Sequence, residues 1–109
     1  MFQVIDMHCD TIPALQWREK QEHLADADLQ INLEKLEKGG SLCQCFSLFT
    51  FLKGLKNETP YEHVRKLIDL WRSEVERYPD RIRQVKTYAD LMQVQKEGKI
   101  GAVMTVEEG

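Results

Sequence analysis

The segment "SLCQCFSLF", Ser41–Phe49, is dense in apolar and aromatic residues and has no helical period. Glycines precede it and a polar loop follows it. A short apolar run bounded by turn residues is typical of a strand buried on both faces, and such strands belong to parallel sheets that carry helices. The segment therefore predicts an α/β fold.

The residues before this segment predict one further strand and two helices. Phe2–Ile5 is short, apolar and partly β-branched, which favours a buried strand. Thr11 is expected to cap a helix over residues 13–24 that has a proline in its first turn. A second, short helix is expected in "NLEKLEKGG", with Asn32 as its cap and the glycine pair as its stop.

The residues after the segment continue the alternation. Thr59 is expected to cap a helix in which apolar residues recur at three- and four-residue steps as far as Tyr78. "RIRQV" predicts a short strand, "TYADLMQVQKEGK" a helix stopped at Gly98, and "IGAVMTVEEG" a last strand. Strands alternating with helices imply right-handed crossovers and a parallel sheet.

The end of the sequence is the pattern of an incomplete domain. The last predicted strand carries Glu107 and Glu108 to its carboxyl end, and the sequence stops at Gly109. A complete domain rarely ends with its chemistry on its last three residues. We therefore expect residues 1–109 to be part of one larger domain.

Composition excludes several classes of partner. The 109 residues are 42% apolar, and a net charge of −3 with interspersed signs offers no basic stripe for nucleic acid. No apolar run approaches the roughly 20 residues of a membrane span, and no targeting segment is recognisable, so we expect a cytoplasmic protein without a membrane partner. Cys43 and Cys45 are expected to be reduced, partly buried strand residues.

Side chains that can bind a metal ion follow the first predicted strand. In an extended chain Asp6, His8 and Asp10 can share one face, which allows His8 and Asp10 to bind one cation together. Imidazole and carboxylate favour a divalent transition metal. A glutamate from another strand could bridge two such ions, and paired ions activate water at neutral pH, which is hydrolase chemistry.

Simpler roles for these residues remain open at this point. His8 could be a hydrogen-bonded core residue, and Asp10 a helix cap or loop residue. Glu107 and Glu108 could lie in a solvated loop. The other two histidines, His23 and His63, stand in polar helical surroundings and are expected at the surface. We expect the tryptophans and the phenylalanines near residue 50 to be packing residues.

The stretches "VIDMHCDTIPAL", "CQCFSLFTF" and "GKIGAVMTVEEG" together resemble the membrane dipeptidase family of zinc peptidases. That family begins its barrel with a strand reading roughly V-I-D-x-H-x-D and places a glutamate at the end of the strand after "GKI". The resemblance implies a metal-dependent (β/α)₈ barrel of the amidohydrolase type, of which residues 1–109 would be the N-terminal third. It also implies hydrolysis of dipeptides by a metal-bridging hydroxide.

By the same resemblance, His8 and Asp10 would bind the first of two zinc ions and Glu107, or alternatively Glu108, would bridge them. Asp6 would support the site from outside the ligand shell. The second zinc's histidines, the substrate-holding residues and the general base would lie in the remainder of the barrel, and a homodimer is possible. Rival expectations are another amidohydrolase-type hydrolase and a non-catalytic α/β binding module.

Overall fold

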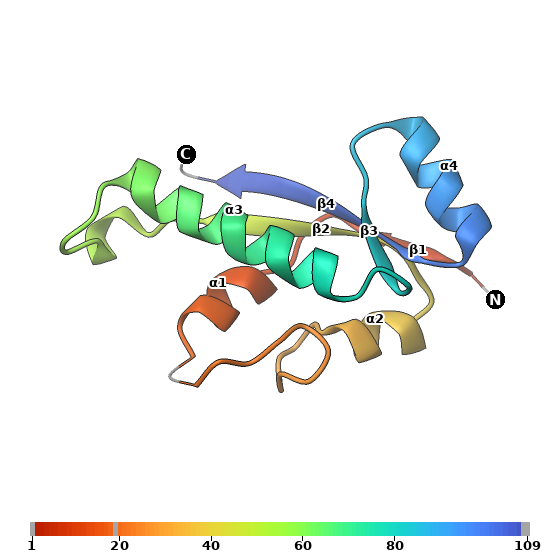
Figure 1. The fold of residues 1–109 in the computed structure, drawn as a ribbon, viewed down its shortest axis with the longest axis horizontal. Helices are drawn as coiled ribbons and strands as arrows, with labels where there is room; N and C mark the ends of the chain where they lie inside the picture. Colours follow the sequence, from red (N-terminus) through yellow and green to blue (C-terminus); the bar gives the residue numbers. More distant parts are fainter. Residues whose placement is uncertain (1, 19, 108–109) are drawn as a thin grey trace.

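Four parallel strands form the sheet in the computed structural model, which describes residues 2–18 and 20–107 (Figure 1). Their order across the sheet is β1-β2-β4-β3, and every neighbouring pair is parallel. The strands are β1 (Val4–Asp6), β2 (Ser41–Phe49), β3 (Ile82–Gln84) and β4 (Ile100–Glu107). The predicted α/β fold and parallel sheet are confirmed, and β2 has the predicted bounds.

Helices connect the strands and cover the sheet. They are α1 (Thr11–Gln16), α2 (Leu33–Lys38), α3 (Pro60–Arg77) and α4 (Tyr88–Glu97), with a 3₁₀ turn η1 (Leu52–Gly54) after β2. Figure 1 shows α1 and α2 together below the sheet and α4 on its other side, with the long α3 crossing in front of the strands. The carboxyl ends of β2 and β4 lie at the same edge.

Local chemistry fixes the starts of α2 and α3 and the end of α4 as the sequence predicts. The Thr59 hydroxyl accepts the Glu62 N–H and the Glu62 carboxylate accepts the Thr59 N–H, a reciprocal capping box. The Asn32 side chain accepts the Lys35 N–H at the start of α2. Helix α4 ends at Gly98, whose φ of 69° is left-handed and costs glycine little.

The main core lies between β2 and the helices α1 to α3. Phe46 and Leu48 of β2 and Trp71 of α3 are at most 1% exposed and pack in one apolar cluster with Ile12 and Leu15 of α1. Burying large apolar side chains is the main favourable term in folding, so this contact fixes α1 beside the end of β1. That placement matters because α1 directly follows His8 and Asp10.

Two predictions for the N-terminal segment are wrong. The first strand is not buried, because β1 is an edge strand with β2 as its one partner among the described residues, which leaves Val4 48% and Ile5 50% exposed. The helix predicted over 13–24 ends at Gln16, and Thr11 is its first residue rather than its cap. The Thr11 hydroxyl instead donates to the Ile31 carbonyl at 2.8 Å.

The prediction that both remaining histidines are surface residues holds only in part, because each is partly buried against a glutamate. His23 lies in the loop after α1, and its Nδ1 is 2.8 Å from the buried carboxylate of Glu74. His63 is 12% exposed, with Nδ1 2.8 Å from Glu58. Trp71 packs as expected, but Trp17 is 68% exposed because the chain leaves the helix there.

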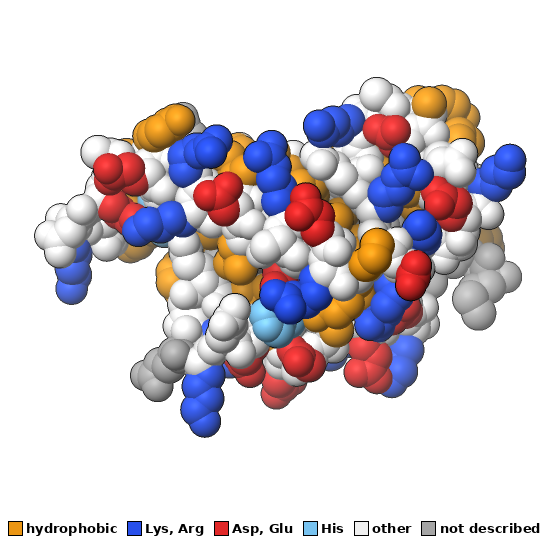
Figure 2. Space-filling view, viewed as in Figure 1, with side chains coloured by type: hydrophobic (Ala, Val, Ile, Leu, Met, Phe, Trp, Pro, Cys, Tyr) orange, Lys and Arg blue, Asp and Glu red, His pale blue; other side chains and the backbone are white. Residues whose placement is uncertain are grey.

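The surface carries mixed charges. Figure 2 shows Lys and Arg side chains interspersed with Asp and Glu over the face that α3 presents, without a large patch of one sign on that face. The three cysteines, Cys9, Cys43 and Cys45, are free thiols and buried, as predicted for the two in β2. No helix among the described residues is long and apolar enough to cross a membrane.

Candidate metal centre

The predicted site residues meet at the carboxyl ends of three neighbouring strands. His8 follows β1, Ser47 lies near the end of β2, and Glu107 is the last residue of β4. In the ladder between β2 and β4, Ser47 pairs with Thr105 and Phe49 pairs with Glu107. The carboxyl edge of a parallel sheet is where α/β folds place their ligand sites.

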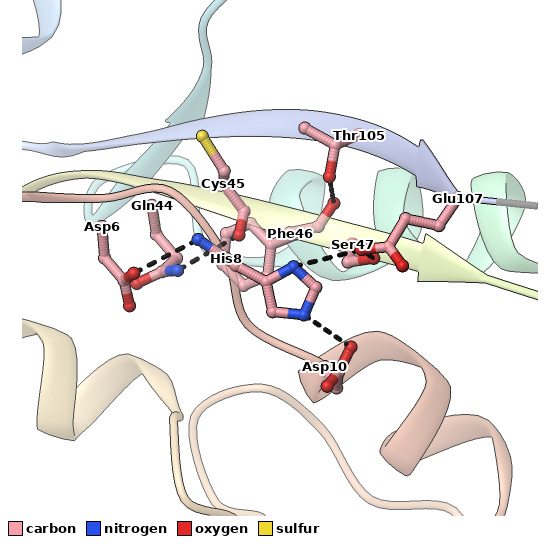
Figure 3. A network of polar contacts seen from close by, with 9 residues as sticks. All are labelled: Asp6, His8, Asp10, Gln44, Cys45, Phe46, Ser47, Thr105 and Glu107. Atoms are coloured by element: carbon pink, nitrogen blue, oxygen red, sulfur yellow. Dashed lines mark hydrogen bonds and ion pairs between the residues drawn. The ribbon is translucent and has the colours of Figure 1, made fainter.

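The imidazole of His8 lies between two carboxylates, as Figure 3 shows. Its Nε2 is 3.1 Å from Asp10 Oδ1, and its Nδ1 is 3.3 Å from Glu107 Oε1. The side chains of His8, Asp10 and Glu107 are 49%, 68% and 49% exposed. His8 is therefore hydrogen-bonded but not a core residue, and the cluster is open to solvent.

Asp10 occupies the cap position of α1 without capping it. Its side chain makes no capping hydrogen bond and is directed to His8 instead. A free aspartate at a helix start would normally accept a backbone N–H of the first turn. The contact with the imidazole thus takes the place of the ordinary structural role of this residue.

Asp6 lies behind the cluster rather than beside the imidazole. Its Oδ1 accepts the backbone N–H of His8 at 3.2 Å. Asp6 pairs with Gln44 of β2. Cys9 is hydrogen-bonded to the residues on either side of Phe46 and therefore lies opposite Phe46. The three steps from Asp6 to Cys9 thus lie opposite only two steps along β2. This extra residue interrupts the regular alternation of side chains between Asp6 and Cys9.

Ser47 is a site residue that the sequence did not reveal. It is fully buried, and its hydroxyl donates to Glu107 Oε1 at 3.3 Å, the oxygen that faces His8 (Figure 3). Its backbone N–H also donates to the Cys9 carbonyl at 3.0 Å, which ties the His8 segment to β2. Ser47 therefore positions both partners of the His8–Glu107 contact.

The donor set suits a divalent cation. Two tetrahedral ligands at about 2.0–2.1 Å from one zinc ion are separated by about 3.3–3.4 Å, and His8 Nε2 and Asp10 Oδ1, at 3.1 Å, are close to that separation. The carboxylates of Asp10 and Glu107 flank the imidazole and that of Asp6 accepts the backbone N–H of the same residue, which makes the local field favourable to cations.

The cluster does not form a closed cage. Across residues 2–18 and 20–107, no group of three or more His, Cys, Asp or Glu side chains is arranged to hold a metal ion. The reason is visible in the contacts: Asp10 and Glu107 approach different nitrogens of the same ring. Glu108, the alternative to Glu107, lies outside the described residues.

The cysteine beside the cluster does not add a ligand. Cys9 is 6% exposed and packs in the apolar core. Burial raises the pKa of its thiol. Hydrogen bonds with Thr11 lower this pKa by less, and the charges of Asp6 and Asp10 add a small further increase. A thiol must lose its proton to bind zinc, so imidazole and carboxylate remain the donors here.

Comparison with known proteins agrees with this architecture. The structure of dipeptidase AC, a metallopeptidase of family M19, matches 96% of this chain with a TM-score of 0.74 and 15% sequence identity. The chain spans 35% of that protein's length, and its parallel α/β architecture matches that part of the dipeptidase, whose fold is a (β/α)₈ barrel. A search of curated proteins gave no match.

A family model extends the comparison to the sequence itself. The model described as membrane dipeptidase, peptidase family M19, matches residues 1–109, which is the entire sequence. The match includes the His8–Asp10 segment at one end and the strand that carries Glu107 at the other. The chain therefore belongs to the membrane dipeptidase family of peptidases.

Proposed function

We propose that this chain supplies the first metal-binding half-site of a zinc-dependent dipeptidase, as the N-terminal third of its single barrel domain. His8 and Asp10 would bind one zinc ion, and Glu107 would bridge it to a second ion held by the rest of the barrel. The observation that carries the proposal is the convergence of His8, Asp10 and Glu107 at one carboxyl edge of the sheet.

Each residue has a distinct part in this proposal. His8 and Asp10 would hold the ion through the imidazole Nε2 and the neighbouring carboxylate, and the Asp6 carboxylate accepts the His8 backbone N–H. The Ser47 hydroxyl donates to the Glu107 carboxylate and so holds it beside the imidazole. Bound zinc would supply an activated water and polarise the peptide carbonyl of a dipeptide.

The exposure of the cluster supports a substrate site. A cavity of about 320 Å³ is lined by His8 and Asp10 together with Leu29–Ile31. Cavities of this size take small molecules, and a dipeptide is within that range. The polar edge would receive the peptide group, and Leu29 and Ile31 offer apolar contact.

The test is metal-dependent dipeptide hydrolysis by the whole protein that contains this chain. We expect removal of metal by a chelator to abolish hydrolysis and zinc to restore it, with no such effect from magnesium, which prefers oxygen ligands. Full activity in the chelated protein would contradict a zinc dipeptidase.

A further inference from the structure

Glu74 is a buried carboxylate far from the strand ends. It lies on α3 and is 1% exposed. A carboxylate removed from water is tolerated only where donors replace its hydration. The neighbouring acidic residue on the same helix, Glu76, is exposed and takes part in no ion pair among the described residues.

The donors to Glu74 come from the loop between α1 and α2. Oε1 accepts the backbone N–H of Leu24 at 2.5 Å, and Oε2 lies 2.8 Å from His23 Nδ1. The Arg77 side chain approaches Oε2 at 3.6 Å from one turn along α3. The Tyr78 hydroxyl adds a further anchor by accepting the Ala25 N–H at 3.3 Å. These contacts join α3 to the middle of the loop.

The far end of this loop forms one wall of the cavity beside the candidate metal ligands. Leu29–Ile31 line that cavity together with His8 and Asp10. The wall is held by polar contacts to its carbonyls: Thr11 Oγ1 donates to Ile31, and Lys35 Nζ to Leu29. The loop is therefore anchored near the site by Thr11 and Lys35 and near its middle by Glu74, with further hydrogen bonds to the Ala27 and Asp28 carbonyls between them.

We propose that Glu74 is a positioning residue, which through His23 and Leu24 holds the Leu29–Ile31 wall at the distance from His8 and Asp10 that fits a dipeptide. This inference rests on the proposed dipeptidase function. Glu74 touches neither the ligands nor the substrate, so it acts on substrate fit rather than on the metal. Its loss should weaken dipeptide binding while zinc remains bound.

The test compares Glu74→Gln with Glu76→Gln, the same change at an exposed position of the same helix. In the whole protein, Glu74→Gln is expected to raise KM for a dipeptide about tenfold, with zinc content retained and kcat changed less than KM. Hydrogen–deuterium exchange over residues 20–32 should become faster, because Leu24 N–H and His23 lose a charged acceptor. Glu76→Gln should match the unchanged protein in all four measurements.

A second variant guards against a general loss of folding. His23→Gln leaves the Leu24–Glu74 bond in place and should raise KM in the same direction by a smaller factor. Unchanged exchange in Glu74→Gln would overturn the anchoring role, and faster exchange with an unchanged KM would overturn the positioning role. Loss of zinc in parallel with KM would also overturn it, because Glu74 would then act on the fold as a whole.

If the unsubstituted protein has no dipeptidase activity, the proposed function is wrong. If the unsubstituted protein is active and Glu74→Gln leaves its KM unchanged, only the positioning role of Glu74 is wrong.

Discussion

The arrangement of single side chains around His8 explains which roles the sequence could reveal. His8 and Asp10 are two apart directly after a strand, so their proximity follows from local geometry. Glu107 could be expected because it ends a later strand. Ser47 could not, because its bond to Glu107 joins residues 60 apart, and it depends on a register that no local pattern specifies.

We expect Ser47→Ala to weaken zinc binding about tenfold in the whole protein, because residues that orient metal ligands contribute about 10- to 100-fold to affinity. The change removes the donor to Glu107 and little volume. Competition with a chelator of known affinity measures the effect. Ser73→Ala, which removes an exposed hydroxyl bonded to the Leu70 carbonyl, is the control. Equal affinity in both variants would contradict a role for Ser47.

The cysteine thiols allow a second prediction for single residues. Burial, together with the neighbouring Cys45, raises the pKa of Cys43. The reactive thiolate is therefore scarcer than in free cysteine, whose pKa is about 8.5. Iodoacetamide at pH 7.5 should leave Cys43 unmodified in the folded protein and modify it after unfolding, as read by peptide mass mapping. Rapid modification of the folded protein would show that Cys43 is accessible.

Among the elements, strand β2 and the helices α2 and α3 could be predicted well because their signals are local. Ser41–Phe49 is bounded by glycine and loop residues, and Thr59 with Glu62 marks the start of α3. Helix α1 could not be bounded in the same way. Its continuation is polar, and the chain beyond Gln16 forms a loop in which His23 and Leu24 contact Glu74, a residue at least 50 positions away that no local pattern indicates.

The capping box of α3 should be measurable as stability. We expect Thr59→Ala to lower the free energy of unfolding by about 1 kcal/mol, because the Glu62 N–H loses its acceptor. Thr59→Ser keeps the hydroxyl, so its free energy of unfolding should fall by no more than about half as much. Denaturant unfolding followed by circular dichroism compares the three proteins. The same midpoint for Thr59→Ala as for the unchanged protein would contradict a stabilising cap.

At the scale of the whole molecule, the sheet has edges that the described residues do not cover. Strand β3 pairs only with Ile100–Ala102, so residues 103–107 of β4 have no partner on that side within the described part of the chain. The outer edge of β1 is open in the same sense and carries exposed Val4 and Ile5. Unpaired strand edges with apolar side chains promote association.

The 109-residue chain produced alone should therefore self-associate at micromolar concentration and bind a hydrophobic dye, whereas a longer protein that contains it should not. Size-exclusion chromatography with light scattering measures the association. A monomeric chain that unfolds cooperatively without metal would instead favour the non-catalytic α/β module.

The most direct test of the central claim is the zinc content of His8→Ala in the whole protein, measured by mass spectrometry of the metal. His63→Gln is the matched control, because it changes a histidine that contacts Glu58 rather than the cluster. The account predicts that His8→Ala loses zinc and dipeptide hydrolysis together while His63→Gln keeps both. Unchanged zinc content in His8→Ala would contradict the assignment of the metal centre.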